Sequence, residues 1–350
     1  MQWHKHLAAA SALLAINLPA LASTSTTEIY GQLNVSTDFL DTDSRGESLN
    51  ISSNNSRIGF RGRHIVEPQL TLLWQAETTL RVDSQGGDLI DRDTFLGATG
   101  DWGQVRVGKF DTPLKGLRNR VDFFGNQVGD ARNVVRNRVD NPDGDGQIGW
   151  DERFRNGIAY RTPAWQGVTA EVHYATRLDN NGTTTSDTNA WSGAISWQGA
   201  RAWLAVAHER QVYVNTGAPD FKRSASRVAG YYDIGDLRVT GFYQYAEDPD
   251  DSAYGAGARY RLSEKLALKT QYYRLDADAD DSNAELYAVG LDYQVARNLQ
   301  TYANYAVVRN QDLAALRPYT QGRTTGGGAE LAVDDGSSPS GISLGVSYRF

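Results

Sequence analysis

Apolar and polar residues alternate with a period of two along most of this chain. The pattern is clearest at the C-terminus, where every even position from Ile342 to Phe350 is apolar or aromatic and the odd positions are Ser, Gly, Ser and Arg. Such alternation gives a β-strand one apolar and one polar face. It recurs in about sixteen segments of roughly ten residues, the length that a tilted strand needs to cross a bilayer. The chain is therefore predicted to be all-β.

The connections between these segments alternate between short and long. Short ones include Gly100–Gly103 and Ser263–Lys265, whereas Leu40–Ser52, Asp111–Glu152 and Val307–Ser340 are long and mostly polar. This alternation indicates antiparallel hairpins with both chain ends on the side of the short turns. Together with the strand length, it predicts a sixteen-stranded antiparallel transmembrane β-barrel.

A soluble β-sandwich or solenoid is the main alternative, since it also shows alternation. Its apolar face would be a dry, close-packed core that needs bulky Ile, Leu, Val and Phe. Here that face is often Ala, Gly, Tyr or Trp, hydrophobic residues make up 40% of the chain, and mean hydropathy is -0.51. A barrel with a water-filled interior tolerates this composition, so the barrel is the favoured prediction.

Charge and cysteine content exclude further classes. The net charge of -7 argues against a nucleic-acid partner, because a phosphate-binding surface needs clustered Lys and Arg. The absence of Cys excludes a disulfide framework and a Cys-ligated zinc site.

The N-terminus has the three-part layout of a secretory signal peptide. Lys5 precedes the apolar run Leu7–Leu18, and Ala20 and Ala22 are the small residues of a cleavage site. Residues 1–22 are therefore predicted to be removed and residues 23–350 to form the barrel. The alternative is a buried N-terminal helix.

The order and spacing of several motifs carry a resemblance to a known family. They are Ile29–Ser36, Ser56–Gly62, Arg92–Gly97, Trp102–Pro113, Arg155–Tyr160 and the terminal Phe350. With them the chain resembles the general porins of Gram-negative outer membranes. The resemblance implies a homotrimer, embedded in outer-membrane lipid, that lets small hydrophilic solutes and ions diffuse passively and requires no cofactor.

Residues 111–152 form the longest connection, yet they include Leu114, Leu117, Phe123 and Phe124. A merely solvated loop has little use for such residues, and long loops are commonly functional. We therefore expect the third external loop, folded inward as a constriction loop. An external loop that packs on its neighbours is the alternative.

Charged side chains that face the lumen would select among solutes by charge. Arg57 and Arg61 share one phase of their strand, opposite Ile58 and Phe60, so they are predicted to face the lumen. For Arg61, an ordinary position on the polar face is an equal alternative to a role in selectivity.

The resemblance adds Lys109 and Arg155 to a basic ladder that begins with Arg57. It also implies acidic residues on the facing loop, for which Asp122 and Asp130 are the candidates. Opposed rows of charge would create a transverse field. Strict alternation from Val107 points Lys109 outward, so its lumen position requires a bulge near Gly108.

Residues 141–152 fit the pattern of a calcium-binding loop. Gly146 occupies the position of the sharp turn. The candidate ligands for a possible Ca²⁺ ion are Asn141, Asp143, Asp145, Gln147 and Glu152. A Gly/Asp-rich turn at a loop tip is the alternative.

Two other functions compete with that of a general channel. Serine-based catalysis needs a His base, and after residue 22 the only His are His64, His173 and His208, without a G-x-S-x-G motif. We therefore expect no enzyme activity. A ligand-specific channel would use a row of lumen aromatics; Phe242 and Tyr273 are candidates, but no continuous row stands out.

Overall fold

The computed structural model describes residues 25–83, 89–136, 139–140, 147–177, 189–213, 220–319 and 331–350, with 139–140 and 147–148 described by backbone alone. The predicted signal peptide, residues 1–22, lies outside this range and stays a prediction. Within the described part, no helix combines the length and the apolar character needed to cross a membrane.

Strands dominate the described chain. They are β1 (Ser25–Asp41), β2 (Glu47–Ser53), β3 (Arg57–Glu67), β4 (Leu70–Thr79), β5 (Thr94–Gly100), β6 (Gly103–Asp111), β7 (Val139–Asp140), β8 (Gln147–Ile148), β9 (Arg153–Arg161), β10 (Val168–Arg177), β11 (Asn189–Gln198), β12 (Ala202–Tyr213), β13 (Phe221–Ile234), β14 (Leu237–Glu247), β15 (Asp251–Arg261), β16 (Leu266–Asp276), β17 (Ala284–Ala296), β18 (Leu299–Asn310) and β19 (Ser340–Arg349). Two short helices, α1 (Pro113–Asn119) and α2 (Arg132–Val135), lie between β6 and β9.

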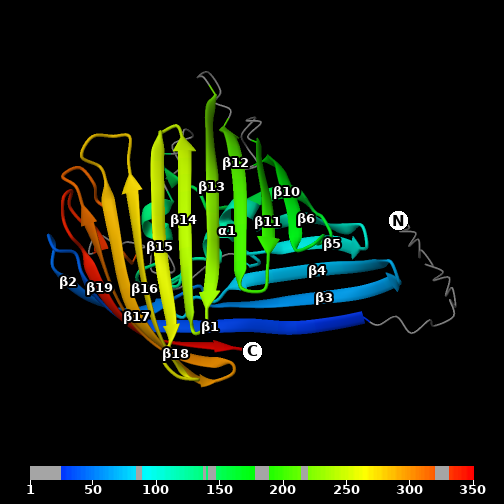
Figure 1. The fold of residues 1–350 in the computed structure, drawn as a ribbon, viewed down its shortest axis with the longest axis horizontal. Helices are drawn as coiled ribbons and strands as arrows, with labels where there is room; N and C mark the ends of the chain where they lie inside the picture. Colours follow the sequence, from blue (N-terminus) through cyan, green and yellow to red (C-terminus); the bar gives the residue numbers. More distant parts are fainter. Residues whose placement is uncertain are drawn as a thin grey trace, which may run out of the picture.

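All strands except β7 and β8 belong to one antiparallel sheet that closes on itself (Figure 1). The last strand, β19, pairs with β1, and the other edge of β1 pairs with β3 and then with β2. Because β2 and β3 pair with the same edge of β1, they are two halves of one strand, which is interrupted at residues 54–56. The seventeen strands of the sheet therefore make a closed sixteen-stranded barrel. The predicted sixteen-stranded antiparallel barrel is confirmed.

The period-two pattern assigns opposite environments to the two faces of the wall. On β12, Leu204 and Val206 are 53% and 47% exposed, whereas the alternate residues Trp203 and Ala205 are nearly fully buried. Exposed apolar side chains all around a barrel are what a hydrocarbon surrounding requires. The apolar face therefore points outward, as predicted.

Two of the predicted long connections are shorter than expected, and the one expected at Val307–Ser340 begins only after Asn310, the end of β18. Residues 40–52 were expected to be a long polar connection, but β2 begins at Glu47 and pairs with the end of β1. Leu49 and Ile51 both point outward and are about 60% exposed. They continue the period-two pattern of a strand, although residues 40–52 are polar in overall composition. The connection itself spans only 42–46.

A buried carboxylate ties the strands at the seam where the barrel closes. Asp38 of β1 is fully buried, and its Oδ1 accepts a hydrogen bond from the Ser343 hydroxyl of β19 at 2.6 Å. Its Oδ2 accepts from the Ser52 hydroxyl of β2 at 2.5 Å. Asp38 thus links the first strand to its neighbours on both sides.

We expect Asp38→Ala to lower the free energy of unfolding by about 2–4 kcal/mol, because hydrogen bonds to a charged group are lost and two buried hydroxyls lose an acceptor. The measurement is the thermal transition of the detergent-solubilised barrel. Asp220→Ala, at an exposed position, is the control and should leave the transition unchanged. An equal shift for both variants would refute a role for Asp38 at the seam.

Candidate functional site: a charged cavity between residues 111–152 and the wall

The connection between β6 and β9 is folded, not open. The Thr112 hydroxyl caps α1 by accepting from the Lys115 N–H at 3.2 Å, and Pro113 occupies the first turn, where its missing N–H costs nothing. The helix α1 contacts β10 to β13, and α2 contacts β15 to β17. The connection therefore touches more than a third of the barrel wall.

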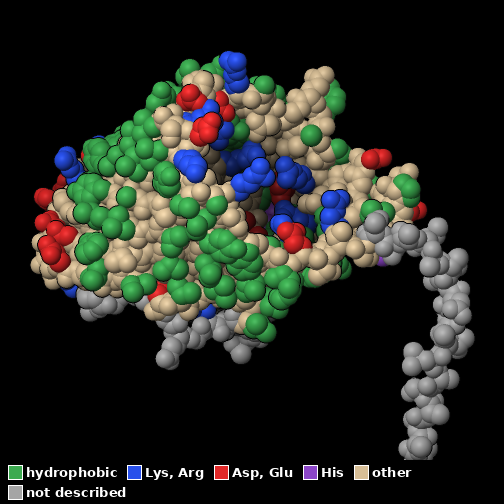
Figure 2. Space-filling view, turned by 90° about the horizontal axis from the view of Figure 1, so that it is seen from below, with side chains coloured by type: hydrophobic (Ala, Val, Ile, Leu, Met, Phe, Trp, Pro, Cys, Tyr) green, Lys and Arg blue, Asp and Glu red, His purple; other side chains and the backbone are tan. Residues whose placement is uncertain are grey.

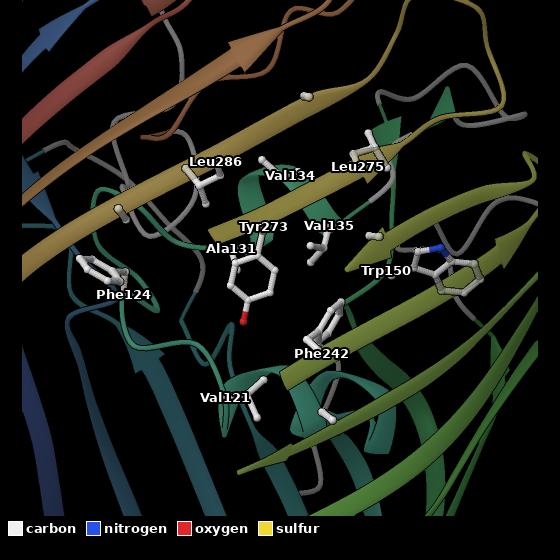
Figure 3. Close-up of a cluster of buried hydrophobic side chains, with 14 of the residues drawn as sticks. Val121, Phe124, Ala131, Val134, Val135, Trp150, Phe242, Tyr273, Leu275 and Leu286 are labelled. Carbon is white, nitrogen blue, oxygen red and sulfur yellow. The ribbon is translucent and has the colours of Figure 1, made fainter. Parts of the chain in front are cut away.

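Apolar residues of this connection are buried against the wall. Phe242 of β14 and Tyr273 of β16 lie close together, with ring centroids 5.6 Å apart, and Val121 lies beside them (Figure 3). Tyr243 and Tyr272, which adjoin these two residues along the strands, belong to the opposite face of the wall. The cluster joins Leu114, Leu117, Val121, Phe124, Val128, Val134 and Val135 of the connection to Trp203, Phe242, Tyr273 and Leu286 of the wall.

A buried charge cluster fixes the same connection. The Arg118 guanidinium lies 2.7 Å from a carboxylate oxygen of Asp151, 2.9 Å from one of Asp122 and 3.1 Å from one of Asp130. Asp151 is also 2.6 Å from Arg227 of β13, which donates to the Leu114 carbonyl at 2.8 Å. Three stretches of the connection are thus joined to one another and to the wall.

Burial and neighbouring charges set the protonation of these groups. Burial and the Asp130 carboxylate raise the pKa of Asp122 to about 7. Burial opposes ionisation of Asp151 as well, but Arg227 and Arg118 hold its pKa well below the usual range. Burial lowers the pKa of Lys115 to about 8, even though Asp111 at 2.8 Å stabilises its charge.

A cavity of about 750 Å³ lies between this connection and the wall. Seen from below, Lys and Arg side chains gather around a hollow in the molecule (Figure 2). The lining includes ten cations, namely Arg57, Arg81, Arg92, Lys115, Arg118, Arg132, Arg153, Arg259, Lys269 and Arg349. Its five acids are Glu77, Asp93, Asp111, Asp122 and Asp292. The formal charge of the lining is therefore +5, whereas the whole chain carries -7.

Several of these cations are held by the acids. Arg92 contacts Glu77, whose other oxygen lies 3.3 Å from Arg57. Arg153 lies 3.0 Å from Asp111 and 2.5 Å from Asp93. Such pairs keep long side chains in place, and the surplus cations leave the cavity positive.

The six predicted constriction residues do not all lie at the cavity. Arg57 and Asp122 line the cavity. Asp130 is buried behind it, bound to Arg118, and Arg61 pairs with Glu28 at 2.7 Å on an exposed surface.

Lys109 and Arg155 do not belong to the described lining of the cavity. The expected irregularity is present: the register of β6 and β9 shifts between Gly108 and Phe110, and Gly108 has φ +145. The Lys109 ammonium group donates to the Ile90 carbonyl at 3.1 Å. The roles of Lys109 and Arg155 in selectivity stay predictions.

Sequence reasoning missed most of the lining cations. Arg259 and Arg349 were recognisable, since both occupy the polar phase of a strongly alternating strand. Arg92, Lys115 and Arg132 come from connections without a period, so no pattern indicated their direction.

Only part of the possible calcium loop lies within the described residues. Asn141, Asp143 and Asp145 lie outside the described residues, and Gln147 is described by backbone alone. The Glu152 carboxylate binds Arg136 and lies 3.6 Å from Arg132. Among the described residues no group of three or more potential metal ligands occurs. Calcium binding stays a prediction.

Comparisons with known proteins agree with this geometry. The family model described as Gram-negative porin matches residues 8–313. Outer membrane porin protein 32 of Delftia acidovorans is 24% identical over 357 residues, covering 97% of this chain and 98% of the relative. The anion-selective porin from Comamonas acidovorans has a similar structure, with a TM-score of 0.78 and 22% identity, covering 93% of this chain and 100% of that one. The trimer form of OmpT from Vibrio cholerae superposes with a TM-score of 0.66 and 19% identity, covering 93% and 99%. The chain therefore belongs to the Gram-negative porins, outer-membrane barrels through which small hydrophilic solutes diffuse passively.

Proposed function

We propose that residues 111–152 fold into this porin as its constriction and that the resulting channel favours small anions. The positive lining of the cavity is the observation that carries the proposal. A sixteen-stranded barrel encloses a channel wider than most small solutes, so a narrowing segment is needed for selectivity.

The contacts of the connection support the inward fold. Its side chains meet wall residues such as Phe242 and Gln271, and the Phe123 N–H donates to the Gln271 side chain at 3.0 Å. The neighbours of these residues along the strands belong to the outward phase, as Tyr243 does at 47% exposure. In a closed barrel, the face opposite the exposed apolar band is the interior.

The charge of the lining supports the preference for anions. Ten cations and five acids line a confined space, and fixed charges in a narrow passage with low-dielectric walls attract counter-ions strongly. Asp122 of the connection and Lys269 of the wall both belong to this lining, and Lys269 donates to the Phe123 carbonyl at 3.2 Å. The structurally similar porin from Comamonas acidovorans is itself anion-selective.

Two further parts of the proposal concern assembly and catalysis. We propose a homotrimer, in line with the trimer form of the OmpT neighbour, and cross-linking in detergent tests it. We also propose that the protein is not an enzyme. Support comes from His64, His173 and His208, the imidazoles of the described residues, none of which hydrogen-bonds a carboxylate there. His173 lies between Phe110 and Phe154. Reaction with a serine-directed probe would overturn this.

Reversing the charge of Arg57 and Arg259 together should remove most of the anion preference, because two Arg→Glu changes take the formal charge of the lining from +5 to about +1. The measurement is the reversal potential of single channels in a salt gradient. Arg201→Glu, in the short turn between β11 and β12 and outside the lining, is the control. An unchanged reversal potential for the double variant would contradict the proposal.

Raising the pH from about 7 to about 9 should weaken the anion preference, because Lys115, with its lowered pKa of about 8, loses its proton in this interval while arginines keep theirs. Asp122, with a pKa of about 7, contributes in the same direction at the lower end. Lys115→Arg should flatten most of the change above about pH 8. A full pH response in that variant would exclude Lys115 as its source.

Arg118→Gln should release the connection at a cost of about 3–5 kcal/mol, because Asp122 and Asp130 lose their cation and Asp151 keeps only Arg227. We expect larger and noisier single-channel currents and faster proteolysis within 111–152. Arg201→Gln, an exposed change in the short turn between β11 and β12, is the control. Quiet channels of unaltered conductance in a folded Arg118→Gln protein would show that the cluster does not hold the constriction.

A further inference from the structure

The strand formed by β2 and β3 contains one residue more than the facing edge of β1. Val35 of β1 pairs with Ser53, and Gln32 pairs with Arg57. The two residues of β1 between these pairs therefore lie opposite the three residues 54–56. An extra residue of this kind is a β-bulge, which shifts the pairing register by one.

The bulge changes which face of the wall the following side chains join. Leu49 and Ile51 point outward, so uninterrupted alternation would direct residue 57 outward as well. A slip of one residue exchanges the two faces, and Arg57 instead lines the charged cavity. Phe60, which is 45% exposed on the outer face, shows that β3 keeps the new phase. The place of Arg57 in the lumen thus depends on the bulge.

Hydrogen bonds to β1 and β18 fix both sides of the bulge. The Asn34 N–H donates to the Ser56 hydroxyl at 2.9 Å, and this hydroxyl donates to the Asn34 carbonyl at 3.0 Å. The Asn54 N–H donates to the same carbonyl at 2.7 Å. The Asn54 side-chain amide donates to the Tyr302 hydroxyl at 2.9 Å. Because Asn54 and Ser56 are buried, these bonds determine how the residue between them is presented.

Asn55, the middle residue of the bulge, lines the cavity and contacts two of its cations. Its φ is +64, a left-handed conformation that Asn adopts more readily than most residues. Its backbone carbonyl accepts a hydrogen bond from the Arg57 guanidinium at 3.2 Å, and its side-chain oxygen accepts one from Arg92. The same two arginines share the Glu77 carboxylate. Two like charges are therefore held by two common acceptors.

We propose that Asn55 is a positioning residue of the channel, which holds Arg57 and Arg92 at the constriction and thereby strengthens the preference for anions. This role rests on the proposed function, since it concerns the same positive lining. The Asn55 oxygens are neutral acceptors, so they orient both guanidinium groups without cancelling their charge, whereas Glu77 cancels part of it. Asn55 determines where two positive charges lie and not how many there are.

Asn55→Gly in the full mature chain tests this role. Glycine adopts the left-handed conformation readily and keeps the carbonyl that binds Arg57, so only the side-chain bond to Arg92 is lost. The formal charge of the lining stays at +5. We expect the chloride-to-potassium permeability ratio, taken from single-channel reversal potentials, to fall about twofold. Asn156→Gly, the same exchange at a left-handed residue with φ +49 outside the described lining, should leave the ratio unchanged.

A second comparison asks whether Asn55 acts through Arg92. Arg92→Gln should lower the ratio by itself, and adding Asn55→Gly should lower it no further, because the partner of the amide is already gone. Thermal transitions establish that the variants are folded. An unchanged ratio in Asn55→Gly, an equal fall in Asn156→Gly or an additive fall in the double variant would overturn the proposal.

These outcomes are separate from those of the proposed function. Each variant is compared with the unaltered protein, so loss of the Asn55 amide should shift the ratio toward potassium whichever ion that protein prefers. A preference of the unaltered protein for potassium would refute the proposed anion selectivity, and the comparison of Asn55→Gly with Asn156→Gly would still decide the role of Asn55.

Discussion

The need to pair every backbone N–H and C=O group inside a membrane is the constraint on which this structure depends. An open sheet would expose two unpaired edges to hydrocarbon, so the sheet must close. Closure requires the last strand to find the first, and β19 pairs with β1 over residues 340–349. Asp38 adds side-chain bonds at this seam, to Ser52 on one side and Ser343 on the other. The period-two pattern follows from the same closure, because the outer face meets lipid and the inner face meets water.

An unobstructed barrel of sixteen strands encloses a channel wider than most small solutes, so selectivity requires a segment that narrows the channel. The connection between β6 and β9 combines an apolar cluster around Tyr273 with a buried cation, Arg118, that holds three carboxylates. The apolar contacts attach the connection without a directional preference. The charge cluster specifies one position, because any displacement would leave charges buried without partners. The remaining cations can then line the cavity at fixed places.

The sequence predicted the architecture well and the site only in part. Regular strands such as β12 alternate without interruption, so both their existence and the direction of Leu204 and Trp203 were predictable. Where the period of two is interrupted, the direction of the side chains could not be predicted. At Gly108 the register shifts, and the places of Lys109 and Arg155 could not follow from counting residues. Arg92 and Lys115 come from connections, where direction depends on tertiary contacts with Glu77 and Asp111 that no local pattern encodes.

The reversal potential of the unaltered protein in a planar bilayer, under a potassium chloride gradient, tests the central claim most directly. The account predicts discrete ionic steps and a reversal potential whose sign shows chloride to be more permeant than potassium. A preference for potassium would contradict the assignment of the positive cavity to the conducting path. The absence of any ionic current from a folded, inserted barrel would contradict the water-filled channel itself.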